Sequence, residues 1–180
     1  MKDKKIAIIG GGNLGTAIAE GLMISGEVEP SQLIVTRRRS ELLQGLELKG
    51  VLTDSDNVSA VTQADVVLIA VKPYQVIEIL KHIAPFLDKN KILISLVAGV
   101  DLNELTMITG NSIPLFRAMP NTAIALQESM TLISTNVKDE QQRKLVIDLF
   151  NKMGKTAIIP DELMAAATVL AACGIAYALR

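Results

Sequence analysis

Short apolar runs alternate with helical patterns along most of this chain. Runs with the length of a strand occupy residues 5–9, 33–36, 65–71, 92–97 and 115–119. Between them, apolar residues recur at helical spacing in residues 13–25, 40–48, 57–62, 74–84 and 102–108. A run that is apolar at every position, such as residues 66–71, predicts a strand buried on both faces. The pattern therefore predicts an α/β fold with a doubly wound, mostly parallel sheet and helices on both of its faces.

The pattern continues beyond the fifth strand run. Residues 130–134 and 156–159 read as two further strands, and residues 139–153 between them read as a helix. We expect these strands to add to the edge of the sheet. The doubly wound unit would then occupy residues 1–160.

A glycine pattern stands at the end of the first strand run. Gly10, Gly12 and Gly15 have the spacing G-x-G-x-x-G and lead into the first helical segment. In a Rossmann-type turn the first glycine permits the tight bend, the second allows backbone to approach a pyrophosphate, and the third lets the helix lie close to the strand. A glycine-rich turn without a ligand would look similar, but the strand before it and the helix after it favour a dinucleotide site.

The residues after the second strand run indicate which dinucleotide binds. NAD-binding versions place an Asp or Glu about here to hold the ribose diol, whereas this chain continues as Thr36, Arg37, Arg38 and Arg39. Guanidinium groups form strong hydrogen bonds with a 2'-phosphate. The segment predicts NADPH rather than NADH, and the alternative is a solvated charge run at a helix start.

Composition narrows the class of protein. The chain has 180 residues, a net charge of -1 and 49% hydrophobic residues, which suits one ordinary domain with a sizeable core and no nucleic-acid partner. Its only cysteine, Cys173, excludes an internal disulfide and fits a reducing compartment. The apolar segment near the start breaks at Gly10, too early for a signal peptide. We expect a cytoplasmic protein.

Ligands of such sheets bind beyond the carboxyl ends of the strands, so the segments after each strand run are candidate site residues. Lys72 and Pro73 follow one run, residues 98–100 follow the next, and residues 120–122 follow the third. Each also has a simpler interpretation, because proline ends strands and Asn-Thr forms turns.

Taken together, several motifs resemble the pyrroline-5-carboxylate reductase family over essentially the whole chain. They are Gly-Gly-Gly-Asn-Leu-Gly at residues 10–15, Asn57, Ala-Val-Lys-Pro at residues 70–73, Ala-Gly-Val at residues 98–100 and Arg-Ala-Met-Pro-Asn-Thr at residues 117–122. The resemblance implies reduction of a cyclic imine, 1-pyrroline-5-carboxylate, to L-proline with NAD(P)H, and the arginines at residues 37–39 favour NADPH.

The resemblance also implies roles for individual residues. The pyrophosphate would meet the glycine turn with Gly10, Gly12, Asn13 and Leu14. The 2'-phosphate side would be Thr36, Arg37 and Arg38, the adenosine end Asn57, and the nicotinamide half Val71, Lys72 and Pro73. The substrate pocket would be edged by Met119, Pro120 and Asn121.

Hydride transfer to a protonated imine asks little of protein side chains beyond alignment and exclusion of water. We therefore expect no metal site and no Ser/His/Asp arrangement. Lys72 is the candidate catalytic group, with a solvated strand-end lysine as the alternative. The sole histidine, His82, is expected on a surface helix without a catalytic role.

By the same resemblance, residues 161–180 would begin an all-α dimerisation domain. Residues 163–179 contain no charged residue, so as a helix they would be apolar all round and need burial by a partner. The segment is short and rich in alanine, which argues against a membrane span. We expect a homodimer or higher oligomer formed through this helix. The family pattern of serine, glycine and proline is lost at Ala171, Ala172, Cys173 and Ile175. The sequence therefore does not identify the residues that bind the substrate carboxylate.

Two other functions fit the same residues. One is another NADP oxidoreductase with a related first domain, such as a deazaflavin-dependent NADP reductase. The other is a non-catalytic module that binds NADPH and a partner. The segment Met-Pro-Asn-Thr at residues 119–122, at the end of the strand run 115–119, favours the imine reductase.

Overall fold

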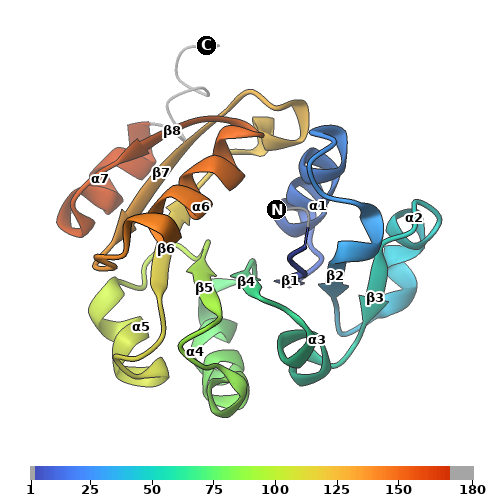
Figure 1. Cartoon of the computed structure of the whole chain (residues 1–180), viewed down its shortest axis with the longest axis horizontal. Helices are drawn as coiled ribbons and strands as arrows, with labels where there is room; N and C mark the ends of the chain where they lie inside the picture. Colours follow the sequence, from blue (N-terminus) through green and yellow to red (C-terminus); the bar gives the residue numbers. More distant parts are fainter. Residues whose placement is uncertain (1–2, 171–180) are drawn as a thin grey trace.

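The computed structural model describes residues 3–170 and shows one eight-stranded sheet flanked by helices (Figure 1). The strands lie in the order β3-β2-β1-β4-β5-β6-β7-β8. Their bounds are β1 Ile6–Ile9, β2 Leu33–Thr36, β3 Leu52–Asp54, β4 Val66–Ile69, β5 Ile92–Ser95, β6 Leu115–Met119, β7 Ser129–Thr135 and β8 Gly154–Ile158. The doubly wound, mostly parallel sheet expected from the sequence is confirmed.

Strands β1 to β6 are mutually parallel. Strand β7 pairs with β6 in the antiparallel sense, and β8 pairs with β7 in the parallel sense. The chain winds outward from β1 to β3 and then crosses back to place β4 on the other side of β1. This reversal of direction lies between β1 and β4, the point at which ligands bind in open α/β sheets.

Helices cover both faces of the sheet. Their bounds are α1 Asn13–Ile24, α2 Gln44–Glu47, α3 Asn57–Gln63, α4 Pro73–Ile83, α5 Leu102–Thr109, α6 Glu140–Asn151 and α7 Met164–Thr168. Short 3-10 turns are η1 Pro30–Gln32, η2 Ser40–Leu43, η3 Ala84–Phe86, η4 Thr122–Leu126 and η5 Asp161–Leu163. In Figure 1, α1 and α6 lie on one side of the sheet and α3, α4 and α5 on the other.

Successive side chains of a strand point to opposite faces of the sheet, so the sheet has one hydrophobic core on each face. Ile6 and Ile8 of β1 belong to the cluster under α1, α2 and α6, whereas Ala7 and Ile9 belong to the cluster under α3, α4 and α5. All four side chains are essentially inaccessible to solvent. Burial on both faces explains why the strand runs are apolar at nearly every position.

Two elements differ from the sequence-based expectation. Strand β3, Leu52–Asp54, was not predicted, because it is a three-residue edge strand whose Leu52 is 44% exposed and so lacks a long apolar run. The helix expected over residues 40–48 is split into η2 and α2. Residues 171–180, where most of the expected C-terminal apolar helix falls, lie outside the described residues.

Helix α1 lies tightly against the turn that follows β1. A Cβ on Gly15 would come 2.1 Å from the carbonyl oxygen of Gly10 and 3.2 Å from Cγ2 of Ile8. Real Cβ atoms do not approach backbone this closely, so any side chain at this position would push the helix away. The expected role of Gly15 in close helix packing is thus supported by the geometry.

We expect Gly15→Ala to destabilise the fold by roughly 1 to 3 kcal/mol, because the added methyl group overpacks the contact with Gly10. The matched control is Gly45→Ala in α2, where a Cβ would meet no atom within 4 Å. Alanine favours a helix interior over glycine by about 1 kcal/mol, so the control should be unchanged or slightly more stable. Urea unfolding of both variants measures the difference, and equal stabilities would contradict the close-packing argument.

Candidate nucleotide-binding site

The glycine turn after β1 lies against the loop that follows β4. The Ala70 N–H donates to the Ile9 carbonyl at 2.8 Å. Gly10 has a φ of +109°, and a Cβ there would lie 2.5 Å from the Ala70 carbonyl oxygen. Only glycine combines this backbone conformation with this contact. The two loops at the switch point therefore form one continuous wall.

The same turn is held to the end of β2. The Thr36 carbonyl accepts hydrogen bonds from the N–H groups of Gly10 and Gly11, at 3.1 and 2.7 Å. A Cβ on Gly11 would lie 2.6 Å from a methyl group of Leu43. The first half of the turn is thus fixed between β2, β4 and η2.

The second half of the turn is open. A Cβ on Gly12 would meet no atom within 4 Å, although Gly12 is the residue from which α1 starts. No described side chain caps α1, and its first turn holds no acidic residue. The leading N–H groups of a helix have no partner within the helix and carry a partial positive charge. Free space beside such a helix start fits a pyrophosphate.

Three predicted adenosine-side residues meet at the end of β2. The Thr36 hydroxyl donates to Oδ1 of Asn57 at 2.6 Å, which ties β2 to the start of α3. Nη1 of Arg37 donates to the Gly11 carbonyl at 3.0 Å, so this side chain lies across the glycine turn. Arg38 and Arg39 are exposed, and the guanidinium group of neither has a hydrogen bond or ion pair to any residue in the described range 3–170.

A carboxylate that sequence reasoning missed lies beside Thr36. Asp54 ends β3 and pairs with Thr36 in the parallel register. Its Oδ1 accepts the Asp56 N–H at 2.9 Å, and this hydrogen bond lowers the pKa of Asp54 below its usual value. The acid is therefore ionised and turned toward the start of α3. Only the unpredicted strand β3 brings it here, so no motif at residues 33–39 could have shown it.

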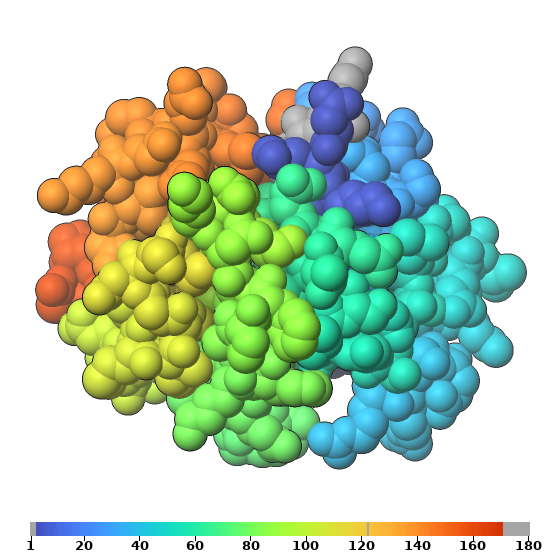
Figure 2. All heavy atoms as spheres, turned by 60° about the horizontal axis from the view of Figure 1, so that its bottom comes forward, coloured from blue at the N-terminus to red at the C-terminus, as the bar shows by residue number. Residues whose placement is uncertain are grey.

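The predicted nicotinamide-side residues form the start of α4. Pro73 is the first helical residue, where its missing N–H costs nothing. Val71 is half-buried. It lies against the glycine turn, because its Cγ1 would be 2.8 Å from a Cβ on Gly10. Lys72 is exposed, and its ammonium group has no hydrogen bond or ion pair with the part of the chain that is described. In Figure 2 a notch separates the green atoms around α4 from the light-blue atoms that follow β2.

The predicted substrate-side residues lie further along the same edge of the sheet, after β6. Met119 is 6% exposed and packs with Leu132 and Met164. Asn121 is nearly buried, and its Oδ1 accepts the Ala123 N–H at 3.1 Å to cap η4. Pro120 between them is buried. The structure thus places these three residues at the expected edge of the sheet, but two strands away from the loop after β4 and three away from the loop after β1.

One charged residue that sequence reasoning did not assign is buried in β6. Arg117 is 5% exposed, and its Nη1 forms an ion pair with Oδ1 of Asp161 at 2.6 Å. The signal was present in the sequence, since an arginine interrupts an otherwise apolar strand and a buried charge needs a partner.

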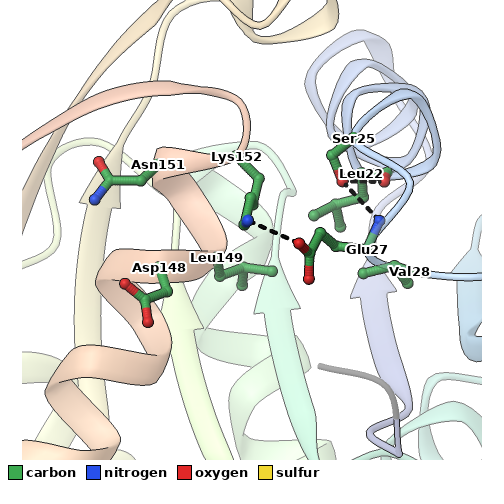
Figure 3. Close-up of a pocket in the computed structure, with 8 residues that line it drawn as sticks. All are labelled: Leu22, Ser25, Glu27, Val28, Asp148, Leu149, Asn151 and Lys152. Carbon is green, nitrogen blue, oxygen red and sulfur yellow. Dashed lines mark hydrogen bonds and ion pairs between the residues drawn. The ribbon is translucent and has the colours of Figure 1, made fainter.

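A surface hollow lies apart from all the predicted site residues. Figure 3 shows it between the end of α1 and the end of α6, with an ion pair of 2.8 Å between Glu27 and Lys152 across it. Leu22, Val28 and Leu149 form its apolar wall. It contains none of the glycine-turn residues and is not part of the nucleotide site.

Other kinds of site are not found between residues 3 and 170. No group of three or more His, Cys, Asp or Glu side chains there could hold a metal ion. No helix in that range is both long and apolar enough to cross a membrane. His82 is exposed on α4, as expected.

Comparison with known proteins gives consistent results. The family model described as NADP oxidoreductase, coenzyme F420-dependent, matches residues 5–99. Pyrroline-5-carboxylate reductase 2 of Dictyostelium discoideum is 34% identical over 194 residues, which cover 99% of this chain and 65% of that protein. Pyrroline-5-carboxylate reductase of Escherichia coli K12 is 32% identical over 164 residues, covering 90% of this chain and 61% of the relative.

Solved structures agree. The crystal structure of Plasmodium falciparum pyrroline carboxylate reductase with NADP bound superposes with a TM-score of 0.91 at 26% identity, covering 99% of this chain and 66% of that one. The pyrroline-5-carboxylate reductase of Coxiella burnetii gives a TM-score of 0.90 at 30% identity, covering 98% and 66%. Pyrroline-5-carboxylate reductase 1 of Dictyostelium discoideum is 32% identical over 192 residues, which cover 100% of this chain and 35% of that protein. The chain thus spans 35% and 65% of the two Dictyostelium relatives. From the glycine turn to the last described helix, the chain belongs to the pyrroline-5-carboxylate reductase family.

Proposed function

We propose that the protein to which this chain belongs reduces 1-pyrroline-5-carboxylate to L-proline by hydride transfer, with NADPH as the preferred cofactor. The observation that carries the proposal is the open space at Gly12, beside an uncapped and acid-free helix start, in a chain of this family. The related Plasmodium protein was crystallised with NADP, which supports a pyridine nucleotide here.

The preference for the 2'-phosphorylated cofactor rests on the end of β2. Arg38 and Arg39 are exposed, and their guanidinium groups, which have no partner among the described residues, are available to an added phosphate. Asp54 pairs with Thr36 on the neighbouring strand, and its Oδ1 is already hydrogen-bonded to the Asp56 N–H. The end of β2 thus carries free cations where NADH-binding versions of the fold carry an acid for the ribose diol.

The bound nucleotide would supply the hydride, and the chain's own residues would position it. Asn13 and Leu14, at the start of α1, would donate backbone N–H groups to the pyrophosphate, while Asn57 would meet the adenosine end. Val71 and Pro73 would shape the nicotinamide side, with exposed Lys72 able to reach cofactor or substrate. Met119, Pro120 and Asn121 would close the substrate side with buried, preorganised backbone.

A second candidate is a deazaflavin-dependent NADP reductase. The family model that matches residues 5–99 is described as a coenzyme F420-dependent NADP oxidoreductase, and coenzyme F420 is a deazaflavin. The first half of the chain is therefore compatible with deazaflavin reduction as well as with imine reduction. A purely NADPH-binding module without turnover is the third. The segment after β6 favours the imine reductase, since the matching relatives over most of the chain are pyrroline-5-carboxylate reductases.

We further propose a domain division and an assembly. Residues 1–160 would form the nucleotide-binding domain, and residues 161–180 would begin a helical domain through which copies associate. In support, Leu163, Val169 and Leu170 are more than half exposed beside α7, an apolar surface that a second copy would cover. We place the protein in the cytoplasm, in keeping with its single cysteine.

Turnover tests the reaction directly. NADPH oxidation, followed by absorbance, should accelerate with pyrroline-5-carboxylate and not with a deazaflavin, using this chain and any longer natural version of it. Faster oxidation with the deazaflavin would instead favour the second candidate. NADPH binding without turnover in the longer version would favour the third.

Replacement of Gly12 tests the nucleotide site without disturbing the fold. A Cβ at Gly12 meets no protein atom within 4 Å, so Gly12→Ala should change the free energy of unfolding by no more than about 1 kcal/mol. NADPH affinity, measured by titration calorimetry, should fall about tenfold or more, because the methyl group occupies the space required by the pyrophosphate. Unchanged affinity in a normally folded variant would place the cofactor elsewhere.

Charge reversal at the end of β2 tests the cofactor preference. Arg37→Asp should weaken NADPH binding about ten to 150-fold more than NADH binding, because a charge-assisted hydrogen bond contributes roughly 1.5 to 3 kcal/mol. Arg38→Asp is the matched comparison, since Arg37 also contacts the Gly11 carbonyl whereas Arg38 does not. Parallel titrations with both cofactors decide the matter, and equal losses for NADPH and NADH in both variants would refute the preference.

A further inference from the structure

The ion pair between Arg117 and Asp161 joins three parts of the chain. Oδ1 of Asp161 accepts from Nη1 of Arg117 on β6 at 2.6 Å. Oδ2 of the same carboxylate accepts the backbone N–H of Leu102, the first residue of α5, at 3.0 Å. One side chain from the segment before α7 therefore holds both a central strand and a helix start.

The pair is buried on the side of Arg117. Its side chain is 6% exposed and that of Asp161 is 19% exposed. The Nε of Arg117 has no hydrogen-bond partner among the described residues, so Asp161 is the group that compensates this charge. A buried cation is costly without its partner, which makes the position of residue 161 strongly dependent on this contact.

A second contact runs beside the first. Arg117 and Met119 are two residues apart on β6 and therefore point to the same face of the sheet. Met119 packs against Met164, just as Arg117 pairs with Asp161. The segment from Asp161 to Met164 is thus attached to β6 at two successive positions, immediately before the buried Pro120 and Asn121 turn.

We propose that Asp161 is a positioning residue that fixes α7 and the start of α5 relative to the end of β6, and through them the substrate side of the site. The proposal rests on the proposed function, because its effect is on use of the imine. Asp161 acts on β6 and α5 rather than on the glycine turn. Its loss should change the use of the imine substrate and leave the cofactor half intact.

The test uses Asp161→Asn, which keeps the shape of the side chain and removes its charge. We expect the KM for pyrroline-5-carboxylate to rise about tenfold, while the Kd for NADPH changes less than twofold. Asp148→Asn is the matched control, since it breaks the exposed ion pair with Lys144 on α6 and should alter neither quantity. Equal changes in KM and in the NADPH Kd would indicate general destabilisation and overturn the proposal.

Amide hydrogen exchange gives a readout that does not depend on turnover. In Asp161→Asn, exchange should accelerate at residues 161–168 and at the first turn of α5, and remain unchanged at the glycine turn. The exchange measurement separates the two proposals. If the unmodified protein does not reduce the imine, the proposed function fails, and the exchange rates alone then decide the role of Asp161. Unchanged exchange at these residues would overturn it.

A double variant covers the case in which Asp161→Asn fails to fold. Arg117→Met with Asp161→Leu removes both charges together and fills the site with apolar groups, an exchange that buried ion pairs often tolerate. This protein should fold, bind NADPH normally and still show a raised KM, because the hydrogen bond to Leu102 is lost. A KM equal to that of the unmodified protein would exclude the positioning role.

Discussion

Close approach of backbone to backbone at the turn after β1 is the constraint on which the rest of the structure depends. The carbonyl of Gly10 lies where a Cβ of Gly15 would be, and the carbonyl of Thr36 holds the N–H groups of Gly10 and Gly11. These contacts fix the start of α1 at the switch point of the sheet, next to the loop after β4. Because the packing is made by main chain, it needs glycine and tolerates little else. The same contacts leave Gly12 free and so create the space for a phosphate group.

Polar contacts around this turn divide into two kinds. Thr36, Asn57 and the guanidinium of Arg37 are engaged with the protein and brace the loops. The guanidinium of Arg38 and the ammonium of Lys72 are exposed, have no partner in the described range and remain available to a ligand. In the proposed site Arg37 combines both roles, because its Nη1 holds the glycine turn while the other N–H groups of its guanidinium can meet a phosphate.

The far end of the site is organised differently, by burial. Met119 and Asn121 use their side chains for packing and turn formation, and Arg117 joins β6 to the segment before α7. The cofactor side is thus shaped by main-chain N–H groups and glycine, whereas the substrate side depends on how the C-terminal segment lies on the sheet. This difference explains why a short sequence motif predicts the cofactor, whereas no short motif predicts the substrate.

The sequence by itself determined the fold class, the glycine turn and the positions of most strands along the chain, because each depends on local periodicity or on a conformation that only glycine adopts. It did not reveal β3, since three half-exposed residues carry no periodic signal. Only the tertiary structure decided that Asp54 lies beside Thr36, that Arg37 is braced against Gly11 and that Arg117 meets Asp161. These contacts join residues far apart in the chain, and their partners are set by strand pairing and burial rather than by neighbouring residues.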